Sequence, residues 1–199
     1  MLDVEGFILV GGQSSRMGRD KSQLIINGQT TSQMIAQALA PVTNRVRLVG
    51  SHSDATLPNI PDSHDRWGPL GGIQAALHAC RTERCLIVAC DLPFVTRELF
   101  ALLLDLMNDS NTVADAIVPV QPDGTPQPLC AVYNCAPCLL AAEVAIANGR
   151  HSPRSMLDKI IVRYLTSDAY VRLPGAEHFF VNLNHPEDYQ LAQKIAATR

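Results

Sequence analysis

Residues 7–21 read FILVGGQSSRMGRDK, four apolar residues followed at once by a pair of glycines. Such a run with an abrupt glycine end is typical of a buried strand. The loop after it contains three glycines and three basic residues, which are Gly11, Gly12, Gly18, Arg16, Arg19 and Lys21. Glycines let successive backbone N–H groups turn toward an anion without interference from Cβ atoms. The stretch therefore predicts a phosphate-binding loop, and a solvated loop is the alternative. The spacing of its glycines and lysine matches neither the Walker motif nor the dinucleotide fingerprint.

Short apolar runs alternate with helical patterns along the rest of the chain. We expect strands at residues 7–10, 46–49, 85–89, 116–120, 129–133 and 178–183, and helices at residues 31–39, 73–80, 96–107, 137–148 and 186–197. This alternation predicts the α/β class, a Rossmann-like three-layer sandwich with a mostly parallel sheet. No segment has the composition of a linker, so we expect residues 1–199 to form a single domain.

Composition limits the setting in which the protein works. The net charge of −3 excludes a strongly cationic domain that grips nucleic acid through phosphate neutralisation. The longest apolar run, residues 99–107, is interrupted by Asp105 and is too short to span a membrane. The first residues are acidic where a secretory signal would be basic, which favours the cytoplasm, and there the six cysteines are expected to be free thiols.

A carboxylate follows the central predicted strand. Asp91 comes directly after Cys85–Cys90 and is followed by Leu92 and Pro93. Ligands of open α/β sheets bind where strands end at their carboxyl side, so Asp91 should face the same crevice as the glycine loop. Beside a triphosphate, such a carboxylate suits Mg²⁺. The alternative is that Asp91 caps the following helix.

Four ordered motifs carry a family resemblance that covers essentially the whole chain. They are Leu9–Lys21 (with Ser15-Arg16-Met17-Gly18), Gly68–Ile73, Cys90–Phe94 and Phe180–Asp188. Together they resemble the molybdenum cofactor guanylyltransferase family of nucleotidyltransferases. The resemblance implies a nucleotidyltransferase fold and an enzyme that converts GTP and molybdopterin into the guanine dinucleotide cofactor and pyrophosphate.

The resemblance also implies roles for individual residues. The nucleotide would be bound by Leu9, Val10, Gly11, Gly12, Lys21, Asp62 and Asp91. Within this set Lys21 would contact the phosphates and Asp91 would also hold Mg²⁺. Asn182 and Asn184 would contact the pterin substrate. Arg16, Lys21 and Asp91 form the expected catalytic set. The family usually has Ala at position 10 and Thr at position 185, where this chain has Val10 and His185.

The expected reaction needs no acid–base pair, because the attacking terminal phosphate of molybdopterin is already anionic. Charge neutralisation by Mg²⁺, Lys21 and Arg16, together with positioning, would carry the rate. Related cytidylyltransferases usually have Ala where this chain has Gly11, and the missing methyl group favours a purine. A methyl group changes the discrimination between two substrates by only about 1–3 kcal/mol, so CTP remains an alternative to GTP as the nucleotide substrate.

Three other interpretations remain at this point. The chain could transfer another nucleotide or use a different phosphorylated acceptor, or it could be a non-catalytic carrier of the cofactor. The pair Cys135 and Cys138 has C-x-x-C spacing, which would also suit a metal or redox module, although Cys80, Cys85, Cys90 and Cys130 look like small core residues.

Residues 149–155 either supply basic contacts or simply begin a solvated helix. Apo-molybdoenzymes or other cofactor-assembly proteins are the expected protein partners.

Overall fold

The computed structural model describes residues 3–11, 24–50, 57–61 and 68–198. A seven-stranded sheet runs through this part of the chain, in the order β5-β4-β1-β6-β8-β7-β9. The strands are β1 (Val4–Leu9), β4 (Arg45–Val49), β5 (Asn59–Ile60), β6 (Arg84–Ala89), β7 (Ala116–Pro119), β8 (Cys130–Asn134) and β9 (Val162–Leu165). Within this sheet β8 pairs antiparallel with both of its neighbours, and the other pairings are parallel. The expected mostly parallel sheet is confirmed.

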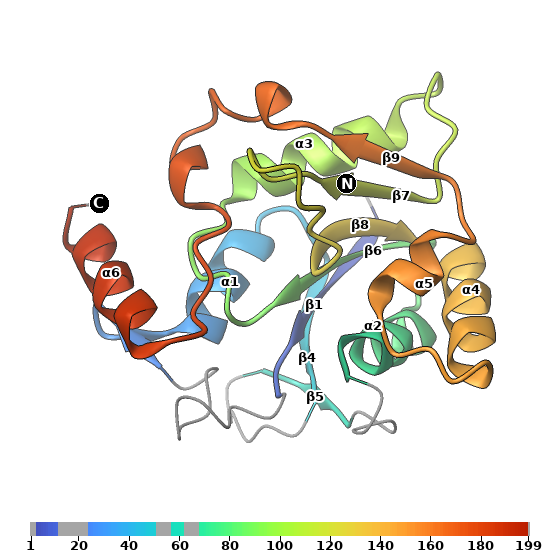
Figure 1. The fold of residues 1–199 in the computed structure, drawn as a ribbon, viewed down its shortest axis with the longest axis horizontal. Helices are drawn as coiled ribbons and strands as arrows, with labels where there is room; N and C mark the ends of the chain where they lie inside the picture. Colours follow the sequence, from blue (N-terminus) through green and yellow to red (C-terminus); the bar gives the residue numbers. More distant parts are fainter. Residues whose placement is uncertain (1–2, 12–23, 51–56, 62–67, 199) are drawn as a thin grey trace.

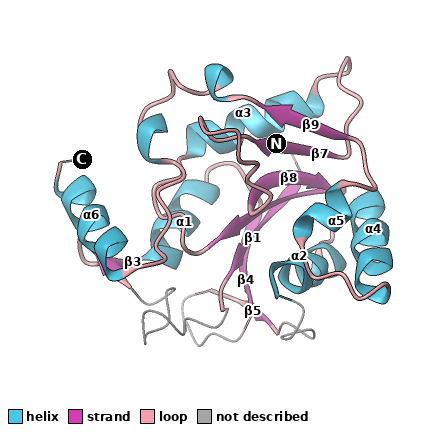
Figure 2. Ribbon diagram, in the orientation of Figure 1, coloured by secondary structure: helices cyan, strands magenta, loops and turns pink. Residues whose placement is uncertain are grey.

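Helices cover both faces of the sheet, as Figures 1 and 2 show. On one face lie α1 (Thr31–Leu39) and α3 (Arg97–Asn108), and on the other α2 (Gly68–Ala79), α4 (Cys135–Ala147) and α5 (Pro153–Leu157). Each face has its own buried apolar cluster, one around Ile8 and Leu99 and the other around Phe7 and Ile73. Side chains of successive strand residues point to opposite faces, which is why neighbours such as Phe7 and Ile8 belong to different clusters. The predicted three-layer sandwich is confirmed.

The carboxyl ends of β1 and β6 lie side by side at the point where the strand order reverses. Strand β1 pairs with β4 on one side and with β6 on the other, and Leu9 is opposite Ala89. The N–H of Cys90 donates to the carbonyl oxygen of Leu9 at 3.0 Å. Ligands of open α/β sheets bind at such a switch point, so the fold places the end of β1 and the start of the Cys90–Asp91 turn at the same crevice.

A small hairpin and the last helix form an attachment beside this crevice (Figure 1). Strands β2 (Ile25–Ile26) and β3 (Gln29–Thr30) are joined by two residues with left-handed backbone, Asn27 and Gly28, as tight hairpins require. Helix α6 (Pro186–Ala197) packs on the hairpin, and the Tyr189 hydroxyl donates to the carbonyl of Ile25 at 2.6 Å. The buried side chains of the attachment are Leu24, Ile26, Phe94, Leu183, Ala192 and Ile195. Phe94 and Leu183 connect it to the chain around Asp91.

Two sequence predictions about elements need correction. Residues 178–183 are not a strand, because Ala176–His178 form a short 3-10 helix and the chain then runs irregularly. Phe179 is buried against the rings of Tyr170 and Phe180, and Leu183 is buried in the cluster of the attachment, so neither is buried by strand pairing. The edge strand is β9, whose exposed Arg163 and Tyr164 hide the apolar pattern of a strand. Helix α2 begins at Gly68, five residues before the predicted start at Ile73.

No helix in the described part of the chain is long and apolar enough to cross a membrane.

Candidate functional site

The end of strand β1 presents backbone to the crevice. Val10 is buried and its N–H donates to the carbonyl of Val49 at 2.8 Å, which fixes the chain at the point where it leaves the sheet. Gly11 is exposed and has φ of 105°, a conformation that a residue with a Cβ atom rarely adopts. The glycine expected here to make room for a base is therefore also required by the backbone.

Gly50 supports the same turn from the neighbouring strand, and sequence reasoning gave it no role. Its φ is 129°, and a Cβ atom built on it would lie 1.7 Å from the carbonyl oxygen of Val10. Its N–H donates to the carbonyl of Ile60 at 2.9 Å, so the close approach is held from both sides. A glycine directly after a predicted strand was the available signal.

Asp91 follows β6 in a turn and is half-buried. Its carbonyl oxygen accepts a hydrogen bond from the N–H of Leu183 at 3.1 Å. This bond brings a segment from the end of the chain to the carboxyl end of the central strand. As a result the two asparagines expected at the pterin flank a residue that is bonded directly to Asp91.

Those two asparagines differ in how they are held. The Oδ1 atom of Asn182 is buried and has no hydrogen-bond partner among the described residues. A buried acceptor without a partner is unfavourable unless a ligand or water satisfies it. The N–H groups of Asn184 and His185 both donate to Oδ2 of Asp188, at 2.9 and 2.7 Å. Asp188 thus fixes the segment at the start of α6, a role that an acidic residue in the first turn of a predicted helix could have signalled.

The N-terminus of helix α2 points to the same edge of the sheet. A Cβ atom on Gly72 would lie 3.4 Å from the Leu9 side chain, so the helix packs directly on the end of β1. The carbonyl of His151 lies 3.9 Å from the position of a Cβ atom on Gly68. Next to it is a hollow of about 990 Å³ whose polar lining includes Arg150, His151, Ser152, Arg154 and Lys159. Residues 149–155 therefore adjoin the beginning of α2, where helix N–H groups favour anions.

The other predicted site residues, Gly12, Arg16, Lys21 and Asp62, lie outside the described residues. Among the described ones, the structure brings together the end of β1, Asp91 and the segment of Asn182 and Asn184. A second hollow, of about 710 Å³, is lined by Gln29, Gln33, Gln37, Arg45 and neighbouring residues of α1 and the start of β4. It lies at the amino end of β4, away from this site.

Comparison with known proteins shows the family to which the chain belongs. The family model described as "MobA-like NTP transferase domain" matches residues 6–164. A relative named probable molybdenum cofactor guanylyltransferase, from Pelotomaculum thermopropionicum, is 31% identical over 98% of this chain and 95% of its own length. The molybdenum cofactor guanylyltransferase of Ralstonia pickettii is 35% identical over 63% of this chain and 65% of its own.

Among solved structures, the molybdopterin-guanine dinucleotide biosynthesis protein A of Archaeoglobus fulgidus is similar with a TM-score of 0.83 and 25% identity, covering 98% of this chain and 100% of the other. The 2-C-methyl-D-erythritol 4-phosphate cytidylyltransferase of Thermus thermophilus shares the fold, with a TM-score of 0.72 and 19% identity over 98% of this chain and 100% of the other. The chain therefore belongs to the MobA-like NTP transferase family and is a nucleotidyltransferase of the molybdenum cofactor guanylyltransferase type.

Proposed function

We propose that this chain transfers GMP from GTP to molybdopterin, giving the guanine dinucleotide cofactor and pyrophosphate. One observation carries the proposal: the hydrogen bond from Leu183 to the carbonyl of Asp91 joins the expected pterin side to the expected nucleotide side. A transferase that joins two phosphates must hold both substrates at one point. Asp91 comes two residues after Ala89, which pairs with Leu9 at the end of β1, so it would be the residue where the two sides meet.

On the nucleotide side, we assign the guanine and ribose to Leu9, Val10 and Gly11. The left-handed backbone of Gly11 supports this assignment, because it leaves an open approach to the chain where a side chain would stand. Gly12, Lys21 and Asp62 complete the proposed nucleotide set, with Lys21 at the phosphates.

The carboxylate of Asp91 suits a hard cation. It is a half-buried oxygen donor at a crevice, and no cluster of three His, Asp or Glu ligands adjoins it among the described residues. Mg²⁺ in nucleotide sites takes one or two carboxylates together with phosphate oxygens and waters, so this donor set fits it. Bound there with the triphosphate, Mg²⁺ would neutralise negative charge at the phosphates.

The remaining work belongs to the chain's own groups. Lys21 and Arg16 would hold the triphosphate and balance the charge that moves to the departing pyrophosphate. The fixed turn of Val10 and Gly11 would align the α-phosphorus with the incoming phosphate of molybdopterin. Because that phosphate is already an anion, no residue is assigned as a general base.

On the acceptor side, the buried Oδ1 atom of Asn182, which has no partner among the described residues, would accept from an N–H group of the pterin ring. Asn184 is exposed and its backbone is anchored by Asp188, so its side chain is presented from a fixed position. The hollow by residues 149–155 is lined by Arg150, Arg154 and Lys159 against one carboxylate, Asp158, and this excess of positive charge would suit a phosphate of either substrate.

We further propose that residues 1–199 act as one unit, that the reaction takes place in the cytoplasm, and that apo-molybdoenzymes or other cofactor-assembly proteins receive the product. All six cysteines are free thiols, which suits a reducing compartment.

The test is pyrophosphate release with each of ATP, GTP, CTP and UTP, with and without molybdopterin. We expect release with GTP only when molybdopterin is present, and a product with the mass of the guanine dinucleotide. Faster release with CTP would reject the assignment of the base, and GTP binding without any product would favour the cofactor carrier. The Asn182→Ala variant should raise KM for molybdopterin and leave KM for GTP unchanged; an equal rise in both would reject the acceptor assignment.

A further inference from the structure

Three cysteine side chains from separate elements meet at the amino end of the sheet. Cys80 directly follows helix α2, Cys85 is the second residue of β6, and Cys135 is the first residue of α4. Their Sγ atoms all lie within 4.8 Å of one another. The sequence pattern pointed instead to the pair Cys135 and Cys138, because the chain spacing hides the approach of Cys80 and Cys85.

The local structure holds the three thiols in place. The N–H of Cys135 donates to the carbonyl of Glu83 at 2.8 Å, which ties the start of α4 to the turn before β6. In that turn the Thr82 hydroxyl donates to the carbonyl of Arg84 at 2.8 Å and lies 3.2 Å from Sγ of Cys80. Cys85 is fully buried, whereas Cys80 and Cys135 are half-buried. One side of the cluster is therefore open to solvent.

The spacing of the sulfur atoms suits a common metal ion. Thiolates bind Zn²⁺ at about 2.3 Å, so three of them around one ion lie about 4 Å apart. Sulfur atoms already within 4.8 Å of one another need to approach by only about 1 Å. A single disulfide, by contrast, would use two of the three thiols and leave the third without a function.

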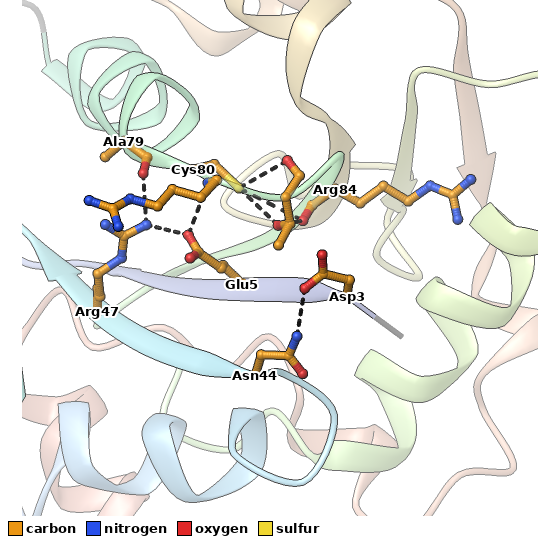
Figure 3. A network of polar contacts seen from close by, with 9 residues as sticks. Asp3, Glu5, Asn44, Arg47, Ala79, Cys80 and Arg84 are labelled. Atoms are coloured by element: carbon orange, nitrogen blue, oxygen red, sulfur yellow. Dashed lines mark hydrogen bonds and ion pairs between the residues drawn. The ribbon is translucent and has the colours of Figure 1, made fainter. Parts of the chain in front are cut away.

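A buried ion pair lies beside the cluster. Figure 3 shows Cys80 near the buried pair of Glu5 and Arg47. The Arg47 guanidinium donates to the carbonyl of Ala79, next to Cys80, at 2.8 Å, and the Glu5 carboxylate balances its charge.

We propose that Cys80, Cys85 and Cys135 form a three-thiolate site for a soft d¹⁰ cation, Zn²⁺ or Cu⁺. Thiolates select these two ions over hard cations such as Mg²⁺. Each thiol that becomes a ligand releases its proton to solvent. Cu⁺ would be satisfied by three sulfur atoms, whereas Zn²⁺ would add a water on the open side of the cluster.

The site is separate from the guanylyl transfer chemistry. Cys85 stands four residues before the last residue of β6, which is roughly 13 Å along a strand from the carboxyl end. An ion there would join the end of α2, the start of β6 and the start of α4. Its effect would be to hold two helices to the sheet, with no part in phosphate chemistry.

The experiment measures metal binding by the reduced, full-length protein. One equivalent of Zn²⁺, or of Cu⁺ under anaerobic conditions, is added in the presence of a competing chelator, and X-ray absorption then counts the neighbours of the ion. We expect one ion per chain with three sulfur neighbours at about 2.3 Å, and a Tm that rises on binding. Four sulfur neighbours, nitrogen or oxygen neighbours alone, or no ion retained against the chelator would overturn the proposal. Comparing the Zn²⁺ titration with the Cu⁺ titration identifies which of the two ions the site retains against the chelator.

Cysteine variants separate this cluster from the C-x-x-C pair. Cys80→Ala and Cys135→Ala should each lower the affinity for the metal ion by about 10–100-fold or more. This range is the loss found when a residue that only supports a metal ligand is replaced, and the loss of a ligand itself should be at least as large. The matched control is Cys138→Ala, three residues from Cys135, whose thiol donates to the carbonyl of Asp115 and is outside the cluster. Equal loss in Cys138→Ala would reject the three-thiol site, as would a disulfide between any two of the three cysteines in the protein isolated under reducing conditions. Cys80 and Cys135 carry the test because they are half-buried, whereas Cys85 and the control Cys138 are both fully buried. The Cys138→Ala variant is therefore compared once its Tm shows that it is folded.

Discussion

The two ends of strand β6 differ in whether their buried oxygen atoms have hydrogen-bond partners within the chain. At the carboxyl end, Asp91 is half-buried beside a glycine turn, and the buried Oδ1 atom of Asn182 has no partner in the part of the chain that the structure describes. At the amino end, the buried Glu5 carboxylate accepts from the Arg47 guanidinium and, at 3.3 Å, from the N–H of Arg81. Arg47 also lies over the Phe7 ring, 4.7 Å from its centre. The carboxyl end therefore leaves a buried acceptor for another molecule, whereas the amino end pairs its buried carboxylate with the chain's own donors. The Nε atoms of Arg47 and Arg84 at the amino end have no partner among the described residues.

This difference follows from the parallel sheet. Helices leave the carboxyl ends of parallel strands through loops, so these ends collect backbone N–H groups and side chains that can face a ligand. The amino ends receive helices, and charges buried there must be balanced by the protein itself. Substitutions at the carboxyl end should therefore change activity more than stability, and those at the amino end should do the reverse.

The largest expected effect is that of Asp91→Ala. Loss of the carboxylate proposed to hold Mg²⁺ at the triphosphate should reduce kcat by about 10³-fold or more, while the free energy of unfolding stays nearly constant. Steady-state pyrophosphate release and chemical denaturation measure the two quantities. Asp105→Ala, an exposed carboxylate on α3, is the control and should change neither. Turnover of the Asp91 variant near the native rate would remove the basis of the nucleotide site.

At the opposite end, Arg47→Met should lower the free energy of unfolding by about 3–4 kcal/mol, because it leaves the buried Glu5 carboxylate without its cation. At temperatures where the variant is folded, KM for GTP should be unchanged. Replacing both partners, Glu5→Leu with Arg47→Met, should recover much of the lost stability. If the single variant loses affinity for GTP while keeping its stability, the division between the two ends is wrong.

Gly50 lies between these extremes, since it is a structural residue at the functional end. In Gly50→Ala the new Cβ would collide with the Val10 carbonyl and shift the turn at Gly11, so stability should fall by about 1–3 kcal/mol and KM for GTP should rise. Gly124→Ala is the matched control, because Gly124 also has positive φ but has open space around it. Its loss of stability should be smaller, and its kinetics should match those of the unchanged protein. Equal effects of the two variants would mean that the contact with Val10 is unimportant.

The sequence predicts the layers of this fold well because the core strands and helices carry clear apolar patterns. Residues 85–89 are continuously apolar since β6 is buried on both faces. The prediction failed at residues 178–183, where buried aromatic residues mimic a strand, and at β9, which is partly exposed. Burial and alternation are what sequence patterns report, and neither distinguishes an irregular buried segment from a strand.

For the site, the sequence indicated that the end of β1 and Asp91 share one crevice, and the pairing of Leu9 with Ala89 confirms that these two segments are neighbours. It did not indicate Gly50, whose importance depends on an approach between two strands. It also missed the meeting of Cys80, Cys85 and Cys135, because contacts between a helix end, a strand and another helix have no fixed spacing in the chain. The roles of all the predicted site residues stay predictions, and Gly12, Arg16, Lys21 and Asp62 lie outside the described residues.

The smallest expected effect tests whether the last helix serves the carboxyl end. Asp188→Ala removes the acceptor of the Asn184 and His185 N–H groups, a loss comparable to that of a helix cap, about 1 kcal/mol. Because this segment is bonded to Asp91 through Leu183, KM for molybdopterin should rise about fivefold while KM for GTP stays constant. Glu187→Ala, the exposed acidic neighbour in the same helical turn, should leave both values unchanged. A drop in stability without any change in KM for molybdopterin would show that Asp188 stabilises the start of α6 but does not position the acceptor side of the site.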